Sequence, residues 1–291
     1  MDSRQKLLAF ASSNWIEGLI KEYELEVRVE ARWPTILLNS AERRMVWSIS
    51  SLLGVNGKGV PGSACRLLEK YLSSHVRTFL QETRNAEEWV QYKNVVSSRF
   101  YLLIVSCVLL AAKMIDMQAP LNASTVRSKL LKVDVDHSTL DIVVMEIHVF
   151  NYLGYRIPLW NTLEIAEFLA VQMGMTSPSV LKAVGLIINL TEYHRDILEL
   201  HMKNWMWHRG PDSSSPPPRS NRVTLHNLHV CAGVVVATAR YMRCVAHNLD
   251  VRLGKILRVE SRYIKAMANT ILLRVLSEAS YVPMLKKRRL M

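Results

Sequence analysis

The segment from Arg99 to Asp116, RFYLLIVSCVLLAAKMID, decides the fold class. Its apolar run from Phe100 to Ala112 contains a single serine and is closed on both sides by a cation, Arg99 before it and Lys113 after it. Crossing a bilayer takes about 20 apolar residues, so this run is too short to be a membrane span. A helix that is apolar on every face must be surrounded by other helices. We therefore expect the buried central helix of a soluble protein.

A second segment of the same kind is LHNLHVCAGVVVATARYM, whose centre from Val230 to Ala239 is also apolar on all sides. Cys107 and Cys231 lie at the hearts of the two runs. Two copies of one five-helix unit would explain the pattern, although no exact repeat is visible. The predicted organisation is an N-terminal arm at 1–33, a first unit at 34–158, a degenerate second unit at 159–282 with a flexible insertion at 208–222, and a basic tail at 283–291.

Helical spacing of apolar residues continues along most of the chain, which predicts an all-α fold. Asn39 and Glu42 form a capping pair that opens a helix ending near Leu53. The further predicted helices begin at Pro61 or cover 89–117, 123–132, 138–153, 161–173 and 179–205. One stretch differs: in YELEVRVEARW, residues 23–33, apolar and charged residues alternate, which is typical of a half-buried strand.

The composition is that of a globular protein, with 49% hydrophobic and 21% charged residues among 291. Lys and Arg number 37 against 25 acids, a net charge of +12 that suits an acidic partner surface or a nucleic-acid-rich setting. The four cysteines are scattered and no C-x-x-C occurs, so we expect reduced thiols in an intracellular protein.

No motif predicts catalysis. The formal G-x-G-x-x-G at Gly57–Gly62 follows a predicted helix rather than a strand, so we interpret it as a helix–helix loop. His226, His229 and Cys231 lack a fourth ligand at a sensible spacing, so we interpret the histidines as helix-surface or boundary residues rather than zinc ligands. The sequence thus predicts a binding module with no enzyme activity, no cofactor and no metal.

The most informative charged residue is Glu146. Its neighbours three and four positions away are apolar, namely Ile142, Val143, Val149 and Phe150, so its side chain should point to the buried side of its helix. A buried carboxylate needs a cation or N–H donors. Lys113, at the end of the central apolar helix, is the candidate partner. The alternatives are a lysine placed by the helix dipole and a carboxylate turned to solvent.

These residues resemble the cyclin box. The family pattern is an apolar helix ending L-A-x-K, then M-E-x-x-[IVL], then a helix closing in L-x-[FY]-x-[IL]-x-x-P. Lys113, Met145-Glu146, Leu153, Tyr155 and Pro158 match it. The resemblance implies that Lys113 and Glu146 hold each other and bond to backbone of the mobile regulatory helix of a cyclin-dependent kinase. It also places Asp116 where cyclins usually carry a second contacting acid.

Residues 85–165 most resemble a divergent meiotic branch of this family, through Trp89, Arg99-Phe100, Val105–Val108 and the Glu146 helix. That resemblance implies a nuclear, chromosome-associated protein that works with meiotic recombination proteins to promote crossover maturation. The segment SAERRMVW carries Arg43 and Arg44 where substrate-recruiting cyclins have a hydrophobic dock, so recruitment there is not expected.

Two alternatives to a kinase partner remain. The fold could act as a kinase-independent scaffold for recombination proteins, or as a cyclin-box protein that contacts nucleic acid directly. The net charge and the tail Lys286, Lys287, Arg288 and Arg289 fit the latter. For the tail itself, a nuclear-import signal or a solvated chain end is the favoured interpretation.

Overall fold

The structure is a computed structural model that describes residues 14–25, 38–82, 85–115, 121–155, 161–207, 225–244 and 248–288, with side chains up to 278 except at 86, 206 and 207. The chain divides into two compact units, each built around one of the two apolar helices. Trp33–Asn161 forms the first, here called the α4 unit, and Met1–Arg32 with Thr162–Met291 forms the second, the α10 unit. The described residues are helical or irregular and contain no strand.

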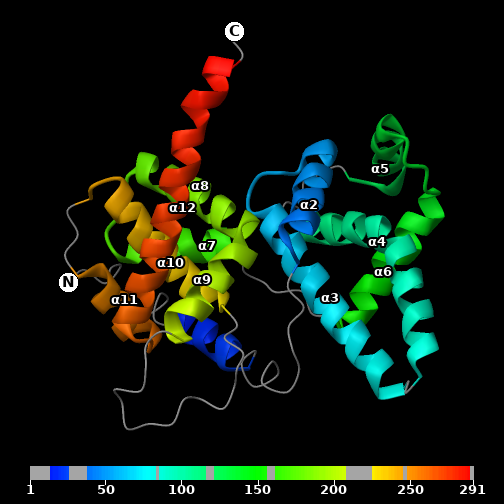
Figure 1. Cartoon of the computed structure of the whole chain (residues 1–291), viewed down its shortest axis with the longest axis horizontal. Coiled ribbons are helices and arrows are strands. Elements are labelled where there is room, and N and C mark those ends of the chain that lie inside the picture. The colour runs from blue at the N-terminus through cyan, green and yellow to red at the C-terminus, as the bar shows by residue number, and fades with distance from the viewer. Residues whose placement is uncertain are drawn as a thin grey trace. The chain divides into compact units, whose positions relative to one another are not determined.

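The described residues of the α4 unit form five α-helices and one short 3₁₀ helix (Figure 1). They are α2 (Ser40–Leu53), α3 (Val60–Glu82), α4 (Ala86–Ile115), α5 (Ala123–Leu130), η1 (Leu131–Val133) and α6 (Thr139–Tyr152). The predicted cap of α2 is confirmed, because Asn39 accepts from the backbone N–H of Glu42 while the Glu42 side chain accepts from that of Asn39 at 2.7 Å. Gly54, with φ of 73°, ends the helix in the left-handed region.

The predicted central role of α4 is confirmed. Its residues from Leu102 to Ala112 are all buried, and α2, α3 and α6 pack around it. By length and composition α4 could cross a bilayer, but 61% of its most apolar window is buried inside the unit. Burial of this extent on other helices is what a core helix shows.

A buried ion pair ties the start of α2 to α3. Arg43 is fully buried and its Nη2 donates to Glu69 Oε1 at 2.6 Å, while its Nε donates to the carbonyl of Leu38. The same carboxylate oxygen accepts the backbone N–H of Leu38 at 3.1 Å. Arg43 is therefore part of the core, and of the two arginines in the segment SAERRMVW Arg44 is the exposed one.

The α10 unit has a longer series of helices. They are a helix over residues 14–25, then α7 (Thr162–Gln172), α8 (Pro178–Tyr193), α9 (Arg195–Trp207), α10 (Asn227–Tyr241), α11 (Leu249–Leu257) and α12 (Ser261–Arg288). The prediction of one helix over 179–205 is wrong, because the chain turns at His194. No Gly or Pro marks this break in the sequence, whereas in the structure the His194 ring lies 3.1 Å from Arg274 Nη2.

The helix α10 is the centre of this unit, as predicted. Every residue from Leu228 to Ala239 is buried, and α7, α8, α11 and α12 pack against it (Figure 1). The close approach of α12 depends on Gly233, since a Cβ there would lie 2.8 Å from Cγ of Met267. Glycine is thus used where two helices meet closely.

The strand predicted for residues 23–33 is wrong where it can be compared. Residues 23–25 belong to the helix over residues 14–25, and 26–33 lie outside the described residues. Leu19 and Ile20 enter the core of the α10 unit, and the ring centroid of Trp15 lies 3.9 Å from that of Phe168. Tertiary burial of one helix face outweighed the local alternation of residue types.

Two predicted segments are only partly described. The insertion at 208–222 lies outside the described residues. The predicted tail begins inside α12, whose backbone continues as far as Arg288, so Lys286, Lys287 and Arg288 are on a helix and Arg289 is outside the described residues.

Candidate functional site

The structure brings Lys113 and Glu146 together. Lys113 lies in the last turn of α4 and Glu146 in the second half of α6, and Lys113 Nζ donates to Glu146 Oε1. The side chain of Glu146 is 15% exposed and that of Lys113 is 47% exposed. The pair therefore sits at the surface of the α4 unit, with its carboxylate turned inward and its amine turned outward.

The position of Glu146 follows from how α6 packs. Ser138 caps α6 with a capping box to Asp141, and α6 buries Ile142, Met145 and Val149 against the core. One turn further, His148 Nε2 lies 3.0 Å from the hydroxyl of Tyr71 on α3. These contacts hold α6 from its first turn to its last, so Glu146 has a defined orientation toward the end of α4.

The ion pair leaves bonding capacity for another molecule. An ammonium has three N–H donors and a carboxylate has two acceptor oxygens, and the pair uses one of each. Among the residues that the structure describes, no other group bonds to Lys113 or Glu146. Donors and an acceptor fixed side by side at a surface are suited to the N–H and C=O groups of a partner's backbone.

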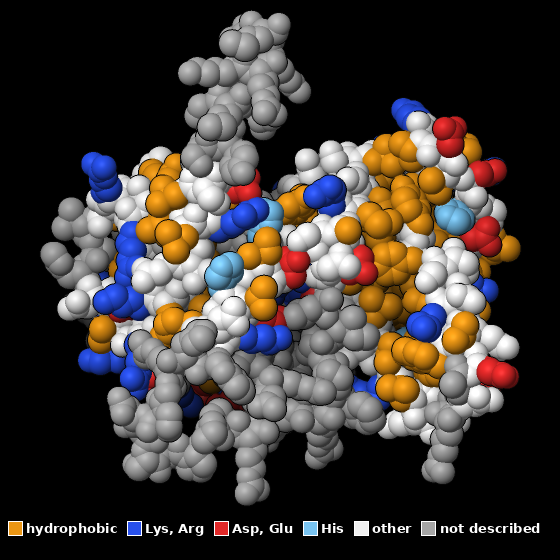
Figure 2. All heavy atoms as spheres, in the orientation of Figure 1, with side chains coloured by type: hydrophobic (Ala, Val, Ile, Leu, Met, Phe, Trp, Pro, Cys, Tyr) orange, Lys and Arg blue, Asp and Glu red, His pale blue; other side chains and the backbone are white. Residues whose placement is uncertain are grey.

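An apolar stripe runs along the exposed face of α6. Leu140, Val143, Val144 and Ile147 are 69%, 40%, 54% and 55% exposed. Their spacing of three and four residues puts them on one side of the helix. Figure 2 shows hydrophobic side chains gathered over the region of α4, α5 and α6. Large exposed apolar side chains that are contiguous mark interaction surfaces.

The apolar stripe of α6 is not predicted from the sequence. The sequence predicts that Glu146 faces the buried side of its helix together with its apolar neighbours, Val143 among them. In the structure Val143 is exposed and only the face with Ile142, Met145 and Val149 is buried. The sequence did contain an indication of the stripe, because α6 has more apolar residues than its one buried face needs.

The other residues of the cyclin-box pattern are less informative. Asp116 and Pro158 lie outside the described residues. Tyr155 follows α6 with φ of 59° and its ring makes an edge contact with Phe150, at 5.2 Å between centroids. Tyr155 thus packs at the C-terminal end of α6, and no described bond connects it to the Lys113–Glu146 pair.

The histidines near α10 form an aromatic cluster in the core of the α10 unit. The ring of His229 lies 4.9 Å from Tyr23 and 5.5 Å from Tyr263 between centroids, and His226 lies 4.2 Å from Tyr23. Burial and the neighbouring His226 lower the pKa of His229 to about 4. Within the described ranges no three His, Cys, Asp or Glu side chains are grouped to hold a metal ion.

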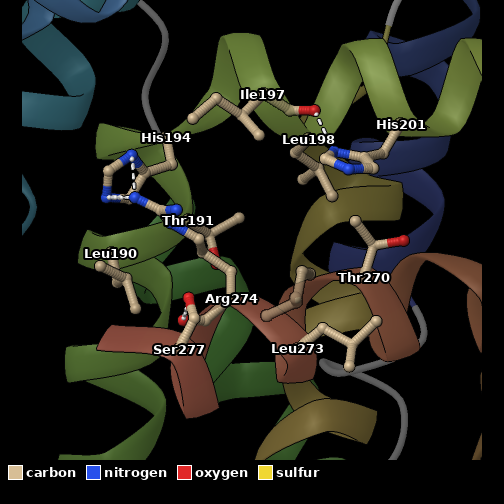
Figure 3. Close-up of a pocket in the computed structure, with 11 residues that line it drawn as sticks. Leu190, Thr191, His194, Ile197, Leu198, His201, Thr270, Leu273, Arg274 and Ser277 are labelled. Atoms are coloured by element: carbon tan, nitrogen blue, oxygen red, sulfur yellow. Dashed lines mark hydrogen bonds between the residues drawn. The ribbon is translucent and has the colours of Figure 1, made fainter. Parts of the chain in front are cut away.

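A groove of about 240 Å³ lies between the α8–α9 turn and α12. Figure 3 shows Arg274 extending from α12 to His194, while His201 is bonded to the carbonyl of Ile197 at the other end. Arg274 also pairs with Glu278 at 2.6 Å. The groove is lined by both apolar and polar side chains, and its arginine is already engaged by His194 and Glu278 of the same unit.

Comparison with known proteins identifies the fold. No family model matches the chain, and no curated protein has a detectably similar sequence. Among solved structures, the chain is similar to a viral cyclin from herpesvirus saimiri, with a TM-score of 0.54 and 12% identity over 88% of this chain and 96% of that one. The expected all-α, cyclin-like fold is therefore confirmed, and identity this low extends the likeness to the fold alone.

Proposed function

We propose that this chain is a cyclin-type regulatory protein whose α4 unit binds a cyclin-dependent kinase. The observation that carries the proposal is the Lys113–Glu146 pair at the surface of the α4 unit, together with the exposed apolar stripe of α6, whose Val143 lies one helical turn before Glu146. Burying the stripe against a partner would contribute a free energy of about 25 cal/mol for each Å² of apolar surface removed from water. The pair supplies directional bonds to backbone at the edge of that area.

The mechanism would be a shift of population in the partner. A kinase with a mobile regulatory helix has active and inactive positions of that helix, and a ligand shifts the balance only as far as it binds one position better. The α6 stripe and the ion pair would favour the one position of the regulatory helix in which that helix contacts both of them. The chain would then act by binding, without chemistry of its own.

The cellular setting is proposed from sequence resemblance. Within residues 85–165 the chain resembles cyclin N-terminal domain-containing protein 1, a divergent meiotic cyclin, through the residues quoted above. By that likeness the protein acts in the nucleus, on chromosomes, and promotes maturation of crossover intermediates together with recombination proteins.

The test is binding to purified cyclin-dependent kinases, measured by pull-down and by titration. A Lys113→Ala, Glu146→Ala double variant and a Val144→Asp, Ile147→Asp double variant are each expected to weaken binding at least tenfold. The matched control is Leu186→Asp on α8, which is 65% exposed in the other unit and should leave the affinity unchanged. Equal binding by wild type and both surface variants would contradict the proposed surface.

A kinase-independent scaffold is the competing function. It predicts that the protein, added to a kinase with a peptide substrate, leaves the rate of phosphorylation unchanged. It also predicts that recombination proteins co-purify from meiotic cells without a kinase. A rise in kinase activity that the Lys113→Ala, Glu146→Ala variant fails to produce would exclude it.

A further inference from the structure

A strongly basic surface lies on the α10 unit, where α10 ends, α11 follows and α12 begins. Its exposed cations are Arg240, Arg243, Arg252, Lys255, Arg258 and Lys265, here called the basic surface. Figure 2 shows Lys and Arg side chains gathered along the left edge of the view, where Figure 1 has α11 and its neighbours. None of these residues belongs to the proposed kinase-binding surface.

These cations belong to one continuous piece of structure. Helices α10, α11 and α12 pack on one another. Arg240, at the end of α10, bonds to Asn269 on α12, and Lys265 lies one helical turn before Asn269. Arg240 and Arg243 line the same hollow, of about 250 Å³, with Asn248 and Asp250 at the start of α11. The positions of these cations thus depend on the packing of three helices and not on a chain terminus.

Acids within the unit do not neutralise this surface. Between residues 240 and 265 the chain has two acids, Asp250 and Glu260, and Glu260 is engaged with Arg262 at 2.6 Å. Within the described part of the chain, Arg243, Arg252, Lys255, Arg258 and Lys265 have no carboxylate at ion-pair distance. Unneutralised cations on neighbouring helices raise the local positive potential and attract polyanions.

We propose that the basic surface binds nucleic acid through its phosphodiester backbone. Four of the six cations are arginines, whose planar guanidinium matches phosphate oxygens with two parallel bonds. Tyr241, between Arg240 and Arg243 in the chain, is 45% exposed and provides a ring on which an unpaired base can stack. The proposal does not depend on kinase binding, which uses the other unit.

An anionic membrane fits the same charge less well. A helix that lies on a bilayer buries a broad apolar face among the lipids. Here the buried faces of α10, α11 and α12 are used inside the unit. Among the described residues between 240 and 265, the large apolar side chains that are exposed are Tyr241 and Val251. Phosphate contacts from separate helices need no such face.

The test uses the full chain and fluorescently labelled DNA, single-stranded and duplex, over a series of salt concentrations. Each neutralised phosphate contributes a slope of about −0.9 in log K against log salt for duplex and about −0.7 for single strands. The variant Arg243→Gln, Lys255→Gln, Lys265→Gln is expected to bind about 30-fold or more weakly near 0.1 M salt. Its slope of log K against log salt should be smaller by the contribution of about three phosphate contacts.

The matched control removes the same charge elsewhere. Arg99, Lys132 and Lys182 are exposed cations outside the basic surface, and their change to Gln should alter affinity by about twofold or less. A separate variant neutralises Lys286, Lys287, Arg288 and Arg289. Equal losses in the surface and control variants, or loss only in the tail variant, would overturn the proposal. So would binding to phosphatidylserine vesicles with no binding to either DNA.

The role of Tyr241 is tested separately, by comparing affinity for single-stranded and duplex DNA. Stacking on an aromatic ring contributes to single-strand binding and not to duplex binding, so Tyr241→Ala should weaken single-strand affinity about fivefold or more while duplex affinity is retained. Unchanged affinity for the single strand would remove Tyr241 from the binding surface. The Gln variant of the basic surface should still bind kinase, which separates this proposal from the previous one.

Discussion

The two units are built on one plan inside and differ outside. Each encloses a continuously buried helical stretch, Leu102–Ala112 of α4 in one and Leu228–Ala239 of α10 in the other. Each also has a buried arginine–glutamate pair: Arg43 with Glu69, and Arg195 with Glu192. Outside, the α4 unit presents an apolar stripe on the helix that carries Glu146, whereas the α10 unit presents the basic surface, whose six cations outnumber the two acids of the same segment. The cores account for the shared fold, and the unlike surfaces indicate unlike partners.

The largest expected effect comes from breaking the buried pair of the α4 unit. Glu69→Ala leaves Arg43 charged and buried, which should lower the free energy of unfolding by about 3–5 kcal/mol. Urea unfolding followed by circular dichroism measures it. The double variant Arg43→Met, Glu69→Leu removes both charges and should recover part of the loss. A cost below about 1 kcal/mol for Glu69→Ala would contradict a structural role for the pair.

The next largest effect is expected from a fall in pH, which should lower the stability of the α10 unit more than that of the α4 unit. The pKa of His229 in the α10 unit is lowered to about 4 by burial and by His226, so the unfolded chain binds its proton at higher pH than the folded chain does. Stability from this residue is complete above pH 6.5 and is lost as pH falls toward 4, by about 3 kcal/mol.

His229→Gln should remove that part of the pH dependence, as seen in unfolding curves collected at several pH values. Burial also lowers the pKa of His75 and His148 in the α4 unit. A His148→Gln variant is therefore the matched control from the other unit, with a smaller change expected. An unaltered pH profile in His229→Gln would show that the ring is not buried in its neutral form.

The packing of α10 gives a smaller effect. Gly233→Ala puts a Cβ against Met267 and Ile271 of α12 and should cost about 1–2 kcal/mol, because overpacking exceeds the gain in helix propensity. The control is Gly185→Ala on α8, where the nearest atom would be 3.5 Å away on Leu163. That change should be neutral or stabilising by up to about 1 kcal/mol in thermal unfolding. Equal costs at both positions would contradict the close approach of α10 and α12.

The smallest effect on stability belongs to the pair proposed to bind a kinase. Lys113→Ala should lower the free energy of unfolding by less than about 1 kcal/mol, because Lys113 is about half exposed. Its effect on kinase affinity should be far larger than its effect on unfolding. A stability loss similar to that of Glu69→Ala would show instead that the Lys113–Glu146 pair serves the fold.

Much of the fold could be predicted from local patterns. The two apolar runs, the capping pair at Asn39 and the loop before Pro61 depend on neighbouring residues only, and each is present in the structure. The break at His194 and the helix over residues 14–25 were not predicted, since no Gly or Pro marks the break and the contacts found at both places involve residues distant in sequence. In residues 23–25, the part of the alternating segment that the structure describes, the chain is helical and continues a helix whose Leu19 and Ile20 are buried.

The sequence by itself determined that the chain is helical, that two buried helices organise it, and that Glu146 and Lys113 are candidates for one another. Only the tertiary structure decided that these two side chains meet at the surface, that Arg43 is buried against Glu69, and that one face of α6 and one end of the α10 unit face solvent. The reason is that helical periodicity reports which residues share a face, whereas exposure of that face depends on which other helices pack against it.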